Sequence, residues 1–232
     1  VVGNTEVGIE TKFKNMKYTE IISPAHVPEL LVREVKPNQG VVIGASVTIN
    51  EIRDFIDTLT GQVASLETGG GWPGMLRGLA AIRDQITWFA SNQIRNVAAI
   101  GGNVVTASPI GDLNPMLISQ GAVATIVSAG KQPRQVPLSE FFLGYRKVDL
   151  AATEILQSIF IPFTKEFEFC IPLKQARRRE DDISIVTGCL RARLKPDTAG
   201  GAWVVEDFAY ALGGMAPTPI SAKACNAAAM GK

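Results

Sequence analysis

The residues whose types and spacing indicate chemistry lie in two segments where glycine is followed by asparagine. The first segment is VVGNTEVG at residues 1–8, and the second is IGGNVVTASPIGD at residues 100–112. Glycine lets the backbone curl so that successive N–H groups converge on an anion, and it has no Cβ to hold a phosphate away. The side chains that would add neutral donors for phosphate or ribose oxygens are Asn4, Thr5, Asn103, Thr106 and Ser108.

Several other kinds of site lack the residues that they need. His26 is the single histidine, which excludes His-rich metal sites and leaves one candidate base for a Ser-His-Asp triad. The sequence has no GxxxxGK[ST] motif and no GxGxxG after a predicted strand, so neither a P-loop nor a Rossmann fingerprint is present. Redox chemistry would therefore need a bound organic cofactor. On the residues alone, two ordinary loop turns remain the simpler interpretation of the Gly-Asn segments.

The composition is typical of a soluble globular protein of one large domain or two small ones. The 232 residues are 46% hydrophobic with a net charge of +1, which gives no electrostatic footprint for nucleic acid. No apolar run reaches the roughly 18 residues of a membrane helix. Cys170, Cys189 and Cys225 lie far apart without a CxxC motif, which argues against a disulfide framework or a Cys-ligated cluster. We expect a protein of a reducing compartment, the cytoplasm or alternatively the peroxisome, with no nucleic-acid or membrane partner.

Hydrophobic periodicity and turn residues predict the elements that position the Gly-Asn segments. The predicted elements are a strand at residues 40–47, a helix opened by a capping box at 48–51, a loop at 67–74, a helix at 75–91, and strands at 122–129 and 154–163. Further along, residues 183–194 and 203–214 predict two strands joined by a hairpin loop, and 219–232 predict a helix with Ser221 near its N-cap. The fold class is therefore α+β or α/β, with a domain boundary within residues 162–169.

The two ends of the chain favour a fragment of a longer protein. The sequence opens without Met, in the middle of a predicted strand, and it stops within a predicted helix. We therefore expect the remainder of the protein to lie on both sides of this chain.

Four motifs in this order resemble the flavin domain of xanthine dehydrogenases. They are VVGNTEVGIE at 1–10, WFASNQIRNVAAIGGNVVTASPIGDLNP at 88–115, FFLGYRKVDL at 141–150 and KQARRREDDISIV at 174–186. That domain belongs to the FAD-binding family typified by vanillyl-alcohol oxidase and by the flavoprotein subunits of molybdenum hydroxylases. The resemblance implies a two-lobed, N-terminally truncated FAD-binding domain at 1–165. A C-terminal flavoprotein subdomain follows at 166–232, a three-stranded antiparallel sheet with a helix.

The resemblance also implies which residues contact FAD between the two lobes. The first cofactor turn is Val2, Gly3, Asn4, Thr5, Glu6 and Val7, and the second is Ala99, Ile100, Gly101, Gly102 and Asn103. The further flavin contacts are Phe89, Asp112, Leu156 and Lys174. Without the resemblance, Phe89 and Leu156 would be core residues by their apolar patterns, and Glu6 and Asp112 would be solvated loop acids.

By the same resemblance, the charged run at 177–182 is a loop beside the flavin that controls access of NAD. Asp181 and Ile183 would line the approach of the nicotinamide, with Tyr145 on the other side. An acidic group near the flavin disfavours the anionic reduced ring, and arginines favour it. Arg179 and Trp88 match two members of a cluster found in mammalian relatives, but Thr87 stands where that cluster has a second arginine. A solvated surface run is the alternative for this segment.

Xanthine dehydrogenases, which the chain resembles, oxidise hypoxanthine and xanthine to urate at a molybdenum centre. They pass the electrons through two [2Fe–2S] clusters to FAD and then to NAD. We therefore expect an oxidoreductase domain of purine catabolism that transfers hydride from reduced FAD to NAD, without a catalytic side chain or metal site of its own. The [2Fe–2S] domains would lie upstream, the molybdopterin domain downstream, and the whole protein would be a homodimer. An aldehyde oxidase-like enzyme that uses dioxygen and a stand-alone flavin-binding module are the alternatives. The segments ASPIGDLNP and RREDD favour the dehydrogenase.

Overall fold

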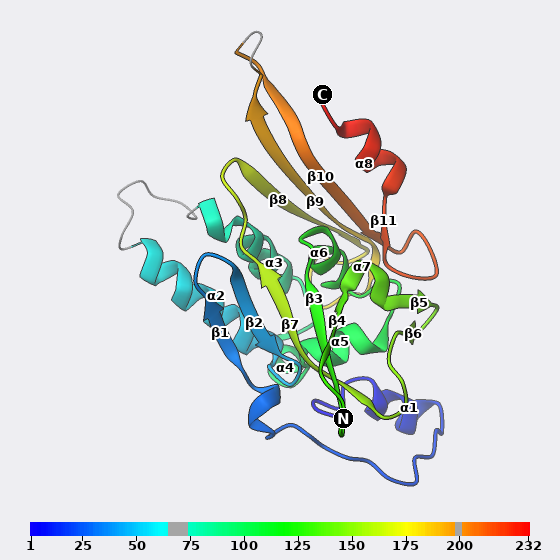
Figure 1. Cartoon of the computed structure of the whole chain (residues 1–232). Coiled ribbons are helices and arrows are strands. Elements are labelled where there is room, and N and C mark those ends of the chain that lie inside the picture. The colour runs from blue at the N-terminus through cyan, green and yellow to red at the C-terminus, as the bar shows by residue number, and fades with distance from the viewer. Residues whose placement is uncertain (65–73, 198–200) are drawn as a thin grey trace.

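The structure of this chain, a computed structural model, describes residues 1–64, 74–197 and 201–232. Within them, a five-stranded sheet has the order β1-β2-β7-β3-β4, a four-stranded sheet has the order β11-β10-β9-β8, and β5 pairs with β6 (Figure 1). All of these pairings are antiparallel. This arrangement confirms the predicted mixed fold with a small antiparallel sheet and a helix after the first domain.

The elements have the following bounds. The strands are β1 (Arg33–Lys36), β2 (Gly40–Gly44), β3 (Val123–Ser128), β4 (Arg134–Pro137), β5 (Phe142–Gly144), β6 (Lys147–Val148), β7 (Glu154–Pro162), β8 (Glu168–Ala176), β9 (Ser184–Pro196), β10 (Trp203–Gly213) and β11 (Ile220–Ser221). The helices are α1 (Val7–Phe13), α2 (Ile49–Ala64), α3 (Arg77–Thr87), α4 (Asn92–Arg95), α5 (Ile100–Thr106), α6 (Asn114–Ser119), α7 (Leu138–Phe141) and α8 (Lys223–Ala229), with 3-10 turns at Pro28–Leu30 and Gly74–Leu76.

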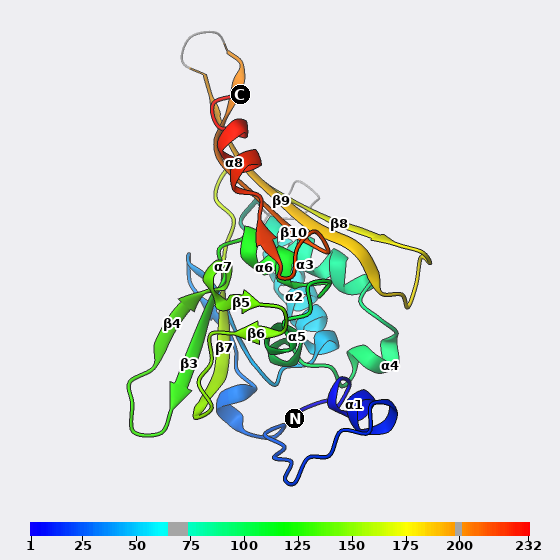
Figure 2. The same cartoon turned by 90° about the vertical axis from the view of Figure 1, so that its right-hand side faces the viewer.

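One hydrophobic core joins the two sheets. Figures 1 and 2 show α2, α3 and α5 on one face of the five-stranded sheet, while α3 and α6 also pack against the four-stranded sheet. Ile82 and Ile86 of α3 are fully buried, and the same core cluster includes Cys189 of β9 and Ala211 of β10. Because the helices are shared, the position of one sheet is tied to that of the other.

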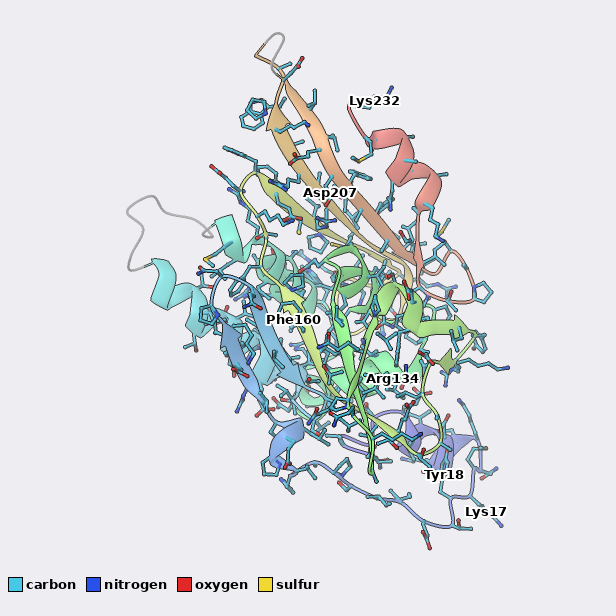
Figure 3. All side chains as sticks on the ribbon, in the orientation of Figure 1. Lys17, Tyr18, Arg134, Phe160, Asp207 and Lys232 are labelled. Atoms are coloured by element: carbon cyan, nitrogen blue, oxygen red, sulfur yellow. The ribbon has the colours of Figure 1, made fainter. Side chains whose placement is uncertain are left out.

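Ion pairs fix the strands at both sheets, and two of the residues that form them, Arg134 and Asp207, are labelled in Figure 3. In the five-stranded sheet, Arg134 donates to Asp149 at 2.8 Å and to Glu154 at 2.7 Å, which lowers the pKa of Glu154 to about 2. At the four-stranded sheet, Arg191 pairs with Glu168 and with Asp207 and donates to the Ser119 carbonyl of α6 at 2.7 Å. These contacts anchor β9 to the helix beneath it.

Helix α2 begins with the capping box that the sequence predicts. The Thr48 N–H donates to Glu51 Oε2 at 2.8 Å, and the Glu51 N–H donates to Thr48 Oγ1 at 3.3 Å. This reciprocal pair is a capping box, which satisfies amide groups that the first turn of a helix leaves unpaired. Of the predicted loop at 67–74, residues 67–73 lie outside the described residues, and Gly74 begins the 3-10 turn at Gly74–Leu76.

Three local predictions are corrected by the structure, and a fourth is confirmed. Val1 and Val2 are not in a strand, and the Val1 amino group instead donates to the Ile22 carbonyl at 2.7 Å. The second Gly-Asn segment is not a loop turn, because its glycines lie within α5. Within the described residues the second sheet has four strands and not three, since the two-residue β11 joins it. Ser221 ends β11 and directly precedes Ala222, the N-cap of α8, so it lies near the N-cap as predicted.

The shared core predicts where the fold is most sensitive. Replacing the fully buried Ile82 by alanine should lower the free energy of unfolding by about 2–5 kcal/mol, because it removes packing that α3 gives to both sheets. Ile22 is 79% exposed, so Ile22→Ala should change it by less than about 0.5 kcal/mol. Urea denaturation of the two variants measures both. Similar losses for the two would contradict the placement of α3.

Candidate functional site

The first Gly-Asn segment packs its backbone directly against the chain that leads into the second. A Cβ added to Gly3 would lie 1.8 Å from the carbonyl oxygen of Val97, so only glycine fits there. Asn4 follows with a φ of +55°, a left-handed conformation that Asn tolerates better than most residues. The Asn4 carbonyl then accepts from the Gly8 N–H at 3.1 Å at the start of α1. The two segments, about a hundred residues apart in the sequence, are therefore neighbours in space.

The two glycines of the second segment face different surroundings. The Gly101 N–H donates to the Ala45 carbonyl at 3.0 Å, and a Cβ on Gly101 would lie 2.7 Å from the Ala45 Cβ. Gly102 is exposed, and a Cβ there would meet nothing within 4 Å. Gly101 is therefore a packing glycine, whereas Gly102 leaves an open stretch of backbone at the start of α5.

A side-chain hydrogen bond connects α5 to the segment that carries the predicted acid. Asn103 Nδ2 donates to Asn114 Oδ1 at 3.1 Å, and Asn114 is fully buried at the start of α6. Asn114 Nδ2 has no hydrogen-bond partner within the described part of the chain. The loop from α5 to α6, which contains Asp112, is thus held against the second Gly-Asn segment.

Asp112 and Lys174 form a buried ion pair that links the first domain to the second sheet. Lys174 Nζ lies 3.2 Å from Asp112 Oδ2 and donates to the Trp88 carbonyl at 2.7 Å, and the two charged side chains are 8% and 13% exposed. Ser184 of β9 donates its hydroxyl to Asp112 Oδ1. Burial raises the pKa of Asp112, while Lys174 and Ser184 act against that shift. Two of the predicted flavin contacts, Asp112 and Lys174, are therefore neighbours, and their contact with a flavin stays a prediction.

The charged loop between β8 and β9 has an ordered backbone. Asp182 accepts from the Arg178 N–H at 2.7 Å and from the Ile183 N–H at 2.9 Å, which lowers the pKa of its carboxyl. Asp181 has a φ of +47°, and Ile183 is 72% exposed. The guanidinium of Arg179 lies 5.4 Å from the centre of the Trp88 ring. The loop is thereby fastened to the end of α3.

A hollow of about 360 Å³ lies between the end of α3 and β8 with its following loop. It is lined by Asp84, Gln85, Trp88, Pro172, Lys174, Gln175, Ala176, Arg177, Arg178 and Arg179. The charged residues of the lining are mostly cationic, four against Asp84, and Lys174 borders the hollow on the side of the ion pair with Asp112.

Tyr145 lies in the turn between β5 and β6, and its neighbour Arg146 holds that turn against the first Gly-Asn segment. Arg146 Nη1 is 2.6 Å from Glu6 Oε1 and 3.8 Å from Glu10 Oε1, and the hydrogen bond to Glu6 raises the pKa of Arg146. The Tyr145 side chain is 63% exposed. Glu6 is thus paired with Arg146 and is not a free loop acid.

The remaining predicted contacts lie in the core or at its edge. Leu156 of β7 is 4% exposed and belongs to the core cluster, and Phe89 is half-buried against it. Ala99 and Ile100 are buried, while Val2, Thr5 and Val7 are half-buried. Contact of these side chains with a cofactor stays a prediction.

Three residues of this site escape the sequence prediction. Arg146 pairs with Glu6, 140 positions away, and Ser184 donates to Asp112, 72 positions away. No local sequence pattern therefore indicates either contact. Asn114 could have been found, because it lies two positions after Asp112 in the quoted motif.

Within the described ranges, no group of three or more His, Cys, Asp or Glu side chains could hold a metal ion. In the same ranges, every helix is too short or too polar to cross a membrane.

Comparison with known families gives two matches along the chain. Residues 1–164 match the family described as FAD binding domain in molybdopterin dehydrogenase. Residues 172–232 match the CO dehydrogenase flavoprotein C-terminal domain.

Among curated proteins, the chain is similar to xanthine dehydrogenases. It is 44% identical to xanthine dehydrogenase of Oryza sativa subsp. japonica over 216 residues, which covers 93% of this chain and 15% of that protein. It is 41% identical to xanthine dehydrogenase/oxidase of Gallus gallus over 226 residues, covering 97% of this chain and 16% of that protein. The chain thus spans only a small part of these relatives.

Solved structures with the same fold include two bacterial enzymes. Carbon monoxide dehydrogenase from Hydrogenophaga pseudoflava superposes with a TM-score of 0.82 at 23% identity, over 100% of this chain and 72% of the other. Quinoline 2-oxidoreductase from Pseudomonas putida 86 superposes with a TM-score of 0.78 at 20% identity, again over 100% and 72%. At these identities the likeness establishes the fold.

The contact between the two Gly-Asn segments can be tested by adding a methyl group. Gly3→Ala should lower the free energy of unfolding by about 1–3 kcal/mol, because its Cβ would overlap the Val97 carbonyl. Gly61→Ala is the matched control, since a Cβ there meets nothing within 4 Å and alanine stabilises a helix by about 1 kcal/mol relative to glycine. Thermal unfolding compares the two. Equal and small effects would show that the segments do not touch.

Proposed function

The chain belongs to the family of FAD-binding domains of molybdopterin dehydrogenases, and from this premise we propose that its two Gly-Asn segments hold FAD. The observation that carries the proposal is their juxtaposition, with Gly3 against Val97 and with Gly102 open to solvent. Backbone N–H groups can bind a phosphate where the ligand approaches the backbone closely, and Gly102 leaves the backbone open for such an approach. The residue types around it therefore fit the cofactor.

The cofactor contacts divide into those that bind phosphate and ribose and those that face the flavin. Val2 to Val7 and Ala99 to Asn103 would surround the phosphates and the ribose, with Asn4, Thr5 and Asn103 as neutral donors. Phe89, Asp112, Leu156 and Lys174 would lie toward the flavin ring. Bound FAD supplies two-electron chemistry, while the chain binds and orients it and sets the charge around it. No side chain of this chain needs to act as an acid or base.

The electron partners that we propose follow from the relatives. The chain would be the flavin portion of a xanthine dehydrogenase, which oxidises hypoxanthine and xanthine to urate and passes hydride to NAD. Electrons would reach FAD from [2Fe–2S] domains upstream, and the molybdopterin domain would lie downstream in the same polypeptide. The similarity to xanthine dehydrogenases supports this assignment. We further propose a homodimer in the cytoplasm.

The loop after β8 would form the acceptor side of the flavin. Ile183 and Tyr145 are both largely exposed, so they offer apolar surface to a nicotinamide ring. Asp181 stands beside Ile183 in the same loop and would disfavour an anionic reduced flavin. These three residues would therefore favour hydride transfer to NAD over reaction with dioxygen.

Replacing Gly102 tests the cofactor site most simply. Gly102→Val should abolish FAD retention, because its side chain would occupy the surface that the phosphates approach. The variant should still fold, since a Cβ there meets no protein atom and valine has a somewhat higher helix propensity than glycine. The flavin absorbance of the purified full-length protein measures retention, and circular dichroism measures folding. A folded variant that keeps its full flavin content would refute the site.

The acceptor side is tested by removing one charge. Asp181→Asn keeps a residue that tolerates the left-handed backbone at this position but removes the carboxylate. In the full-length enzyme it should lower turnover with NAD several-fold more than turnover with dioxygen. Steady-state rates with the two acceptors measure the ratio, and Asp54→Asn, an exposed acid in α2, is the control. Equal losses with both acceptors would count against a nicotinamide-side role.

A further inference from the structure

Both carboxylate oxygens of Asp112 are engaged by residues of the second sheet. Oδ2 lies 3.2 Å from Lys174 Nζ on β8, and Oδ1 accepts the hydroxyl of Ser184 at the start of β9. Ser184 is 4% exposed, so bulk water cannot replace Asp112 as the hydrogen-bond partner of its hydroxyl. Within the described part of the chain, Lys174 is the charged group that faces Asp112, and Ser184 is the one uncharged side-chain donor to it.

Lys174 alone does not satisfy the buried carboxylate. Its ammonium group is shared between Asp112 and the Trp88 carbonyl, to which it donates at 2.7 Å. A buried carboxylate that lacks a donor on one oxygen is driven toward its protonated form, because burial disfavours the charge. Removal of the Ser184 hydroxyl would leave Oδ1 without a donor. The lysine would then keep its positive charge beside a carboxyl group that has lost its own.

The position of this cluster relates it to the cofactor. Asp112 lies in the loop that Asn103 and Asn114 fasten to the open glycine of α5, and the Trp88 carbonyl immediately precedes Phe89. The cluster thus lies between the second Gly-Asn segment, the end of α3 and the start of β9. In the proposed function, this is the flavin side of the site.

We infer that Ser184 is a positioning residue for the flavin site, because its hydroxyl orients Asp112 and keeps that carboxylate ionised against Lys174, so that bound FAD faces a balanced charge pair. This inference rests on the proposed function. Ser184 acts through Asp112 and needs no contact with FAD itself.

Removal of the Ser184 hydroxyl should change how the stability of the cofactor-free protein depends on pH. In Ser184→Ala, Asp112 would protonate at a higher pH than in the wild type. A carboxyl group with a raised pKa favours the folded state below its pKa in the unfolded chain, and this contribution is lost as pH rises through its pKa in the folded state. The variant should therefore lose more thermal stability at pH 7 than at pH 4. Ser119→Ala is the control, because Ser119 is equally buried and its hydroxyl donates to the Met116 carbonyl.

A second consequence concerns the bound flavin. When Asp112 is protonated, the charge of Lys174 is uncompensated and favours the anionic reduced ring. Ser184→Ala should therefore shift the midpoint potential of bound FAD to more positive values, and the shift should grow as pH falls from 8 to 5. Asp112→Asn removes the charge at every pH, so its potential should be shifted throughout this range. Ser184→Ala should approach it at the acidic end.

Spectroelectrochemical titration of the full-length wild type and the three variants tests the inference and the proposed function together. The inference is supported when all bind FAD, Ser119→Ala matches the wild type, and Ser184→Ala shows the pH-dependent positive shift. Equal potentials for Ser184→Ala and wild type at every pH, with FAD bound, overturn the inference and leave the proposed function standing. A wild-type protein that binds no FAD overturns the proposed function and the inference together.

Discussion

The close approach of Gly3 to the Val97 carbonyl is the constraint on which the site depends. Without a side chain at Gly3, the N-terminal segment lies directly against the chain that enters α5, and two Gly-Asn segments from distant parts of the sequence become neighbours. Gly101 extends the same principle, because its contact with Ala45 seats α5 on the end of β2. Gly102, the one glycine of the set that meets nothing, is then left facing outward. Gly3 and Gly101 thus allow close packing of the backbone, and Gly102 leaves backbone accessible.

Polar contacts extend this arrangement to the second sheet. Asn103 holds the loop of Asp112, and Asp112 in turn meets Lys174 of β8 and Ser184 of β9. Since a buried ion pair costs desolvation energy, such a cluster is weak evidence for stability and better evidence for a role in placing charge. Arg146 makes a corresponding connection on the other side, where it holds the turn with Tyr145 to Glu6. The site is therefore enclosed by contacts between elements that are distant in sequence.

The sequence predicts those parts of the fold that local patterns determine. The capping box of α2 and the strands β3 and β7 follow from residues within a few positions of one another. Strand β8 escapes prediction because Pro172 interrupts its alternating pattern, and the structure tolerates that proline because β8 is an edge strand. The helical start of the second Gly-Asn segment escapes because paired glycines indicate a turn by propensity, whereas packing on Ala45 favours α5. The bond between Ser184 and Asp112 has no local signal at all.

The central claim is that the paired Gly-Asn segments bind the phosphates of FAD, and ligand discrimination tests it most directly. FAD, FMN and riboflavin share the flavin ring but differ in their phosphates. Titration of the cofactor-free full-length protein, followed by quenching of flavin fluorescence, gives their dissociation constants. The account predicts that FAD binds tightest, that FMN is much weaker and that riboflavin is weakest. Equal affinity for FAD and riboflavin would show that the ring alone is recognised and that these segments have no part in binding.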